Sequence, residues 1–286
     1  MQFLRAESVS DVARCLAESP NAYVLAGGTD LLVQMGTRRI APEMVIDIKH
    51  LPGIGEITQT ENGFRIGAAV PGAKLGEDGA LTSEWPGVTE AAQLIGSTQI
   101  QGRATMAGNL CNASPAADCV PALIAAGAEV EIAGPDGTRM AAVADIPTGP
   151  GKTTLAEGEF VTAILLPKRQ PASGDAYLRF IPRTEMDIAV ASAGAWLQTD
   201  ADGTVTAARV ALGAVAPTAY LVDGAGDLLV GTTLDDDTLK KLEAHCAASA
   251  SPIDDKRGTV AFRIEVAGVL ARRAAKIAYE RAREAK

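Results

Sequence analysis

The architecture of this 286-residue chain depends most on two stretches rich in small residues, AGGTDLL at 26–32 and IGSTQIQGRATMAGNLCNASPAAD at 95–118. Small side chains leave backbone amides accessible, which suits segments that surround a polar or anionic group. The rest of the chain is more conventional, with apolar runs of the length and spacing expected for strands and helices. These two stretches are therefore the candidate functional segments.

The first stretch lies between a predicted buried strand, 22–26, and a short predicted helix. The adjacent glycines Gly27 and Gly28 allow amides to face an anion, and the N-terminus of the following helix adds positive partial charge. Thr29 and Asp30 can bind sugar hydroxyls, or they can simply cap the helix. A Gly-Gly pair after a strand is also typical of an ordinary turn.

The second stretch combines Gly, Ser, Thr and Asn with single apolar residues at Ile100, Met106 and Leu110. This regularity predicts an ordered loop around something polar and is not typical of a linker. Its TMAGN segment at 105–109 offers amides to a diphosphate, with polar residues downstream, although a surface turn has the same composition. Neither stretch contains G-x-G-x-x-G, so a Rossmann dinucleotide site is not predicted.

A third segment, GPGKT at 149–153, resembles the end of a Walker A loop. That motif requires glycine at the position occupied by Ile146, and Pro150 removes an amide donor from the phosphate cradle. An ATP site is therefore excluded at this segment.

The composition restricts the chemistry that the side chains can supply. The chain has two histidines and four cysteines, without a C-x-x-C pair, which excludes a typical zinc or iron–sulfur site. We expect any reactive group to come from outside the polypeptide. The two histidines are His50 and His245, and the four cysteines are Cys15, Cys111, Cys119 and Cys246.

The net charge of −9 and a pI of about 4.9 argue against a nucleic-acid partner, whose phosphates require basic clusters. The segment MQFLRAESVSDVARCL has no long apolar core of the kind found in signal peptides. The longest apolar stretch, 188–197, is too short to cross a bilayer. The expected location is the cytoplasm, without a membrane span.

Strand and helix patterns alternate in the first half, and a Pro/Gly/Ser-rich break, PKRQPASG at 167–174, separates it from long strands followed by helices. We predict a first helix capped by Ser10, a hairpin at 57–67 and a C-terminal antiparallel sheet backed by helices. The predicted strands are 22–26, 44–48, 128–133, 160–166, 176–181, 188–198 and 205–213, and the predicted helices are 88–95, 121–126, 234–248 and 260 onward.

The two small-residue stretches together resemble the FAD-binding medium subunit of molybdenum hydroxylases, the xanthine dehydrogenase and carbon monoxide dehydrogenase family. Further matches occur in the family's order along nearly the whole chain. They are GPGKTTLAEGEF at 149–160, RTEMDIAVASAGA at 183–195 and SPIDDKRGTVAFR at 251–263.

The resemblance implies an α+β fold, namely a two-subdomain FAD-binding fold of the PCMH type followed by a C-terminal three-stranded antiparallel sheet with helices. The implied domains are 1–174, with subdomains of about 1–54 and 55–174, and 175–286. It also implies that the two stretches hold the FAD diphosphate.

The resemblance further implies the cofactor-binding residues. Leu25, Ala26, Gly27, Gly28, Thr29, Asp30 and Leu31 match the first loop, whereas Thr105, Ala107, Gly108, Asn109 and Ser114 match the second. Ile95 matches an apolar position near the cofactor, and Asp118 matches a flavin-contacting carboxylate. Arg179 stands where the family usually has Lys, and Ala107 where it often has Gly. No catalytic side chain and no metal ligand is expected.

In function, the resemblance implies a subunit of a molybdenum-containing hydroxylase or dehydrogenase. Electrons would pass from iron–sulfur clusters of a partner through FAD to NAD⁺, a quinone or another external acceptor. The implied partners are a large molybdopterin-binding subunit and a small [2Fe–2S] subunit, in a dimer of heterotrimers (a heterohexamer). Two alternatives stay open: a self-sufficient FAD-dependent oxidoreductase of the same superfamily, and a non-catalytic scaffold subunit that has lost flavin.

Overall fold

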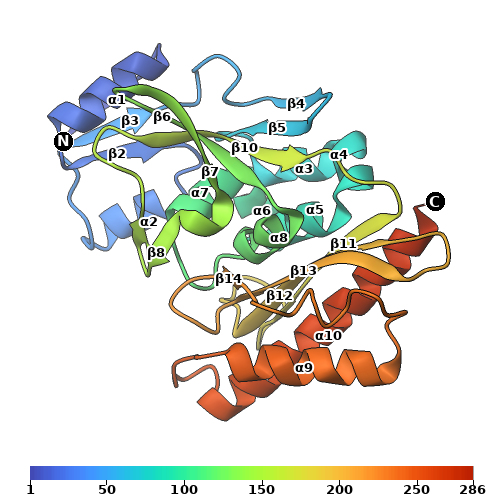
Figure 1. Cartoon of the computed structure of the whole chain (residues 1–286). Coiled ribbons are helices and arrows are strands. Elements are labelled where there is room, and N and C mark those ends of the chain that lie inside the picture. Colours follow the sequence, from blue (N-terminus) through green and yellow to red (C-terminus); the bar gives the residue numbers. More distant parts are fainter. Residues whose placement is uncertain (286) are drawn as a thin grey trace.

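The structure is a computed structural model that describes residues 1–285, with three main sheets and helices packed around them (Figure 1). A small parallel sheet begins the chain, in the order β1-β3-β2. Its strands are β1 (Gln2–Arg5), β2 (Ala22–Leu25) and β3 (Met44–Asp47). Because parallel strands of one sheet need crossover connections, helix α1 (Val9–Glu18) connects β1 to β2 on the far side of β3, and α2 (Leu31–Gly36) lies in the connection from β2 to β3.

The N-terminal cap of α1 differs from the prediction. Ser8, in extended conformation, accepts a hydrogen bond from the Asp11 amide at 3.1 Å. Ser10 lies inside the first turn, where its backbone is already helical, so the prediction that it caps α1 was wrong. Two serines so close in sequence give the same local signal.

The second sheet is antiparallel and has the order β4-β5-β10-β6-β7. The hairpin predicted at 57–67 forms its edge, with Gly63 at φ +125° directly after the turn. The strands of this sheet are β4 (Ile57–Thr60), β5 (Gly63–Gly67), β6 (Glu129–Gly134), β7 (Gly137–Ala142) and β10 (Phe160–Pro167).

Short helices lie beneath this sheet. The stretch 95–118 is ordered, as predicted, but it includes two short helices and is not loop throughout. The helices are α3 (Gly72–Glu77), α4 (Gly79–Glu84), α5 (Pro86–Gln93), α6 (Thr98–Gln101), α7 (Met106–Cys111) and α8 (Cys119–Ala126). The 3-10 turn η1 (Val143–Asp145) and the two-stranded β8 (Pro147–Gly149) and β9 (Lys152–Thr153) complete this part.

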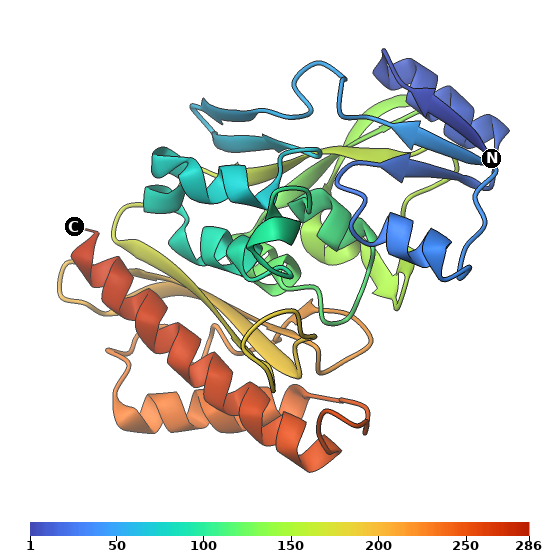
Figure 2. The same cartoon turned by 180° about the vertical axis from the view of Figure 1, so that it is seen from behind.

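The C-terminal sheet is antiparallel, in the order β11-β12-β13-β14; helix α10 packs against one of its faces, and α9 packs against α10 (Figure 2). The three predicted long strands are present, and a two-residue strand, β14, adds a fourth at the edge. The elements are β11 (Ser173–Phe180), β12 (Ala191–Thr199), β13 (Val205–Gly213), β14 (Tyr220–Leu221), α9 (Asp236–Ser249) and α10 (Val260–Glu284).

The predicted domain boundary, Gly174, lies inside β11. This strand begins at Ser173, where the sequence pattern suggested residue 176. A Cβ at Gly174 would lie 2.0 Å from the Ala278 carbonyl oxygen of α10. Gly174, which suggested a domain boundary in the sequence, thus allows β11 and α10 to approach each other closely.

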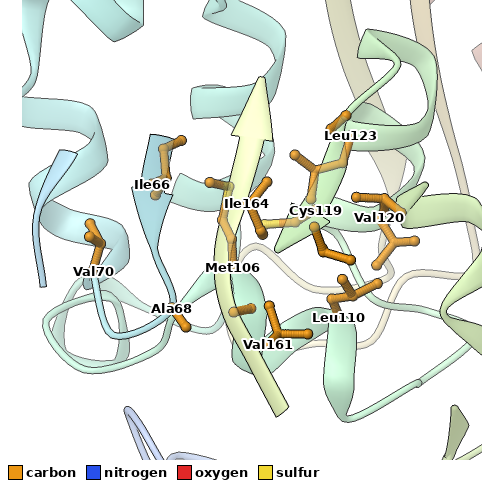
Figure 3. Packing of buried hydrophobic residues seen from close by; sticks show 14 of the residues in the cluster. Ile66, Ala68, Val70, Met106, Leu110, Cys119, Val120, Leu123, Val161 and Ile164 are labelled. Carbon is orange, nitrogen blue, oxygen red and sulfur yellow. The ribbon is translucent and has the colours of Figure 1, made fainter. Parts of the chain in front are cut away.

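All eight residues of α8 are buried because this helix lies between the second sheet and the C-terminal sheet. Figure 3 shows Cys119, Val120 and Leu123 of α8 close to Ile164 of β10, in the larger of the two hydrophobic clusters. On its other side, Pro121 lies so close to the C-terminal sheet that a Cβ at Gly194 would meet its carbonyl oxygen at 2.5 Å. The packing therefore fixes the end of the stretch 95–118 between the two parts of the chain.

Candidate cofactor-binding site

The two small-residue stretches meet at Gly27. A Cβ on Gly27 would lie 2.0 Å from the carbonyl oxygen of Arg103 and 3.1 Å from Ala104 Cα, so only glycine fits this approach. Gly28, at φ +78°, adopts a conformation that other residues rarely take. Gly27 is therefore required by a close contact and Gly28 by a left-handed backbone. An ordinary turn does not impose both requirements.

A side-chain hydrogen bond joins the same two segments. Gln34 of α2 donates from Nε2 to Asn112 Oδ1, at the end of α7, over 3.0 Å. In Figures 1 and 2, α2 lies beside the helices of the stretch 95–118. Contacts at Gly27 and at Gln34, two residues beyond the first stretch, thus hold the two segments in one place.

Part of the first stretch leaves its polar groups unpaired, although the carbonyl oxygens of Gly28 and Asp30 accept hydrogen bonds from the amides of Leu32 and Gln34. Neither Gly27 nor Thr29 makes a hydrogen bond within the part of the chain that the structure describes. Asp30 stands at the N-cap position of α2, but its side chain accepts no capping bond, and desolvation raises its pKa. Of the two roles considered for Asp30, capping is thus not realised, and its carboxylate is free to accept a ligand hydroxyl.

In the second stretch, three predicted residues carry structural hydrogen bonds. Thr105 caps α7, since its Oγ1 accepts from the Gly108 amide at 2.9 Å. Asn109 Oδ1 accepts from the Cys119 amide at 3.1 Å, and Ser114 Oγ accepts from the amide of Ala116 at 3.3 Å. The side-chain amide nitrogen of Asn109, Nδ2, has no acceptor among residues 1–285 and stays available as a donor, whereas its backbone amide donates to the Thr105 carbonyl oxygen at 2.9 Å.

The other predicted residues lie around these segments. Leu25 ends β2 and is buried, whereas Ala26 and Leu31 are partly exposed in the first stretch. Ala107 is buried in the larger hydrophobic cluster, so its methyl group is accommodated by the core where the family often has glycine. Ile95 packs partly buried against the same cluster, and the next residue, Gly96, accepts a hydrogen bond from the Met186 amide at 3.2 Å.

Asp118 and Arg179 form a buried ion pair. Asp118, just before α8, is 8% exposed, and its Oδ2 accepts from Arg179 Nη1 of β11 at 2.7 Å. Burial raises the pKa of Asp118 to about 6, although Arg179 and a neighbouring hydroxyl act in the opposite direction. Two residues 61 positions apart in sequence thus meet at one point.

Tyr177 belongs to the same group and was missed in the sequence. Its hydroxyl donates to Asp118 Oδ1 at 2.9 Å, and the residue is 3% exposed. Burial, followed by the charge of Asp118, raises the tyrosine pKa well above its ordinary value. Because alternate residues of a strand share a face, Asp175, Tyr177 and Arg179 all point from β11 in one direction. Strand alternation from Arg179 could have identified it.

Other sequence candidates stay outside this arrangement. The GPGKT segment touches it at one point, where the Gly151 amide donates to the carbonyl oxygen of Ala113 at 3.0 Å. His245 Nε2 is 2.7 Å from the Asp223 carbonyl oxygen. Among the residues described, no group of three or more His, Cys, Asp or Glu could hold a metal ion. No helix within 1–285 has the length and apolar character needed to cross a membrane.

The arrangement suits an extended, anionic, hydroxyl-bearing ligand such as a dinucleotide. The two stretches meet at Gly27, the first with the amides of Gly27 and Thr29 unpaired, and a carboxylate without a capping role, Asp30, lies beside them. A buried Asp118–Arg179 pair marks a second, more hidden part of the site. None of these groups is arranged as a nucleophile with an adjacent base.

Comparison with known proteins supports a cofactor site. Residues 1–169 match the family described as "FAD binding domain in molybdopterin dehydrogenase", and residues 176–278 match "CO dehydrogenase flavoprotein C-terminal domain". The chain is 34% identical to the carbon monoxide dehydrogenase medium chain of Afipia carboxidovorans, over 98% of this chain and 96% of that one. It is 31% identical to the xanthine dehydrogenase FAD-binding subunit of Escherichia coli O157:H7, over 92% and 90%.

The fold agrees with these sequence matches. A solved structure, reconstituted CO dehydrogenase from Oligotropha carboxidovorans, superposes with a TM-score of 0.94 and 32% identity, and the match covers 98% of both chains.

Proposed function

The chain belongs to the family of FAD-binding medium subunits of molybdenum hydroxylases, and on that premise we propose that it passes electrons from the [2Fe–2S] clusters of a partner subunit through FAD to an external acceptor, NAD⁺ or a quinone. It is an oxidoreductase subunit whose molybdenum and iron–sulfur centres belong to partner chains. The observation that supports the proposal best is the close approach of Gly27 to Arg103, which brings two distant stretches together into one cradle for the cofactor.

The residues present fit FAD. Gly27, Gly28 and Thr29 would hold the diphosphate through backbone amides, together with the start of α7, since such amides and helix N-termini stabilise negative charge. The Asp30 carboxylate and the side-chain amide of Asn109 would bind hydroxyl groups of the cofactor. The remaining predicted residues would line the same site: Leu25, Ala26, Leu31, Ile95, Thr105, Ala107, Gly108 and Ser114.

Asp118 and Arg179 would lie at the ring system of the cofactor. When bound, FAD supplies the ability to accept electrons singly and to deliver them in pairs. The chain's own contribution is position, exclusion of water and fixed charge. The buried pair carries no net charge while Asp118 is ionised, and one positive charge once the carboxyl is protonated.

Medium-chain relatives indicate a large and a small partner subunit. We propose a dimer of heterotrimers located in the cytoplasm, with domains at 1–174 and 175–286. The domain division is supported by the two family matches, which lie on either side of the boundary.

The proposal is tested by purifying the untagged complex from cells that express the chain with its neighbouring reading frames. We expect flavin absorbance, bound FAD, and copurification of a large molybdopterin-type chain and a small cysteine-rich chain. A colourless chain that takes up no FAD would point to the scaffold alternative. A chain that is isolated alone and turns over unaided would identify a self-sufficient oxidoreductase.

A further inference from the structure

Tyr177 is the residue of the cofactor region to which neither motif assigns a role. Its hydroxyl donates to Asp118 Oδ1 at 2.9 Å, while Arg179 Nη1 donates to Oδ2 at 2.7 Å. Both carboxylate oxygens are thus held by side chains of one strand, β11, two residues apart. The tyrosine is 3% exposed, so the hydrogen bond forms away from solvent.

We propose that Tyr177 is a positioning residue of the flavin site, whose hydroxyl holds the Asp118 carboxylate in the orientation and charge state in which it pairs with Arg179. The inference rests on the proposed function, because it takes Asp118 and Arg179 to face the flavin. Tyr177 acts through Asp118 and does not itself touch the cofactor.

The charge of Asp118 depends on opposing influences, of which burial is the largest. Burial favours the neutral carboxyl, whereas the two donors from β11 favour the carboxylate, and the resulting pKa of about 6 lies close to neutral pH. Cys119, beside it on α8, has a thiol pKa raised well above its ordinary value and stays neutral. Arg209 of β13 binds the Ile124 carbonyl oxygen at the far end of α8. Loss of one donor is therefore enough to change the charge of Asp118.

Tyr177 is suited to this role because its hydroxyl stays protonated and can donate to the carboxylate. Its own pKa is raised well above the ordinary value by burial and by the charge of Asp118, so its hydroxyl keeps its proton where Asp118 is ionised. Without the hydroxyl, the pKa of Asp118 rises, the carboxyl is protonated at neutral pH and Arg179 becomes an uncompensated cation. A positive charge beside a flavin stabilises its reduced, anionic form and raises its midpoint potential.

The test is the pH dependence of the flavin midpoint potential, measured by spectroelectrochemistry on the FAD-loaded complex. In the wild type, the potential should rise more steeply with falling pH while Asp118 takes up its proton, and this extra slope should end in a break near the Asp118 pKa of about 6, below which the carboxyl is protonated in both flavin states. In Tyr177→Phe, this break should move upward by about one to two pH units, the usual effect of one charge-assisted hydrogen bond. Asp118→Asn should abolish the break, and the double variant should behave as Asp118→Asn alone.

Tyr279→Phe is the matched control. Tyr279 of α10 is also buried, and its hydroxyl donates to the Gly203 carbonyl oxygen at 2.8 Å, away from both stretches. The Tyr279→Phe variant also loses a buried tyrosine hydroxyl, but the break in its potential should stay at the wild-type pH.

Three results would overturn the inference: a wild-type break in FAD-loaded Tyr177→Phe, a shift that persists when Asp118 is already Asn, or an equal shift in Tyr279→Phe. If Tyr177→Phe fails to assemble, ring-fluorinated tyrosine at position 177 replaces it. Its stronger donor should lower the pH of the break, and an unchanged break would contradict the role. Absence of FAD from the wild-type complex would instead refute the proposed function.

Discussion

Replacing Gly27 with alanine should weaken FAD binding strongly, because the new methyl group would meet backbone and not a flexible side chain. Its Cβ would lie 2.0 Å from the Arg103 carbonyl oxygen, and ordinary contact begins at 3.4 Å, so the two stretches must separate by about 1.4 Å. A hydrogen bond to a phosphate oxygen does not survive such a displacement. Loss of one charge-assisted bond, about 1.5–3 kcal/mol, corresponds to an affinity lower by about 10- to 150-fold.

The assay is titration of the flavin-depleted complex with FAD, followed by the quenching of flavin fluorescence, with urea unfolding of each variant in parallel. Gly36→Ala is the control, since it makes the same substitution at the end of α2, where a Cβ would meet nothing within 4 Å. We expect Gly27→Ala to lose about 1–3 kcal/mol of unfolding free energy as well, from the forced separation. An FAD affinity within about twofold of that of Gly36→Ala would refute the cradle.

Three further predictions follow from buried contacts. Asp175→Ala should lower the unfolding free energy by about 3–5 kcal/mol in urea titrations, because Arg169 would lose its buried partner; a loss below about 1 kcal/mol would contradict this. The pKa of Asp118 is higher in the folded chain than its ordinary 3.8, so the folded state binds this proton more readily than the unfolded state. The unfolding free energy of the wild type should therefore fall, relative to that of Asp118→Asn, as pH rises from about 4 to about 6. A parallel pH profile of the two would show that the shift is absent. Gly28→Val should abolish FAD retention, since it combines φ +78° with a contact of 2.7 Å to Leu25 Cδ1, while the circular dichroism of the C-terminal domain should persist; full flavin occupancy would exclude this assignment.

Elements with strong local patterns were predictable from the sequence. The strand Val205–Gly213 has the predicted bounds, and the hairpin at 57–67 forms at its Asn-Gly signal. Both depend on alternation and turn chemistry, which are properties of neighbouring residues. The N-cap of α1 was misassigned because Ser8 and Ser10 are equivalent locally, and only the backbone path distinguishes them.

Features that depend on tertiary contacts could not be found in this way. The need for glycine at position 27 comes from Arg103, 76 positions away (103 − 27), and rules based on neighbouring residues cannot detect such a contact. The hydrogen bond from Tyr177 to Asp118 likewise joins residues 59 positions apart. The helical turns within 95–118 are short, and their low intrinsic stability is compensated by burial of Met106 and Leu110 in the larger cluster.

The most direct test of the central claim is the cofactor content of the chain purified with its partner subunits. The account predicts stoichiometric FAD that is reduced when the holoenzyme oxidises its substrate and reoxidised by the external acceptor. It also predicts that Gly27→Ala lowers the FAD content, whereas Gly36→Ala preserves it. A complex that assembles and turns over without FAD, or that keeps full FAD with the cradle disrupted, would contradict the account.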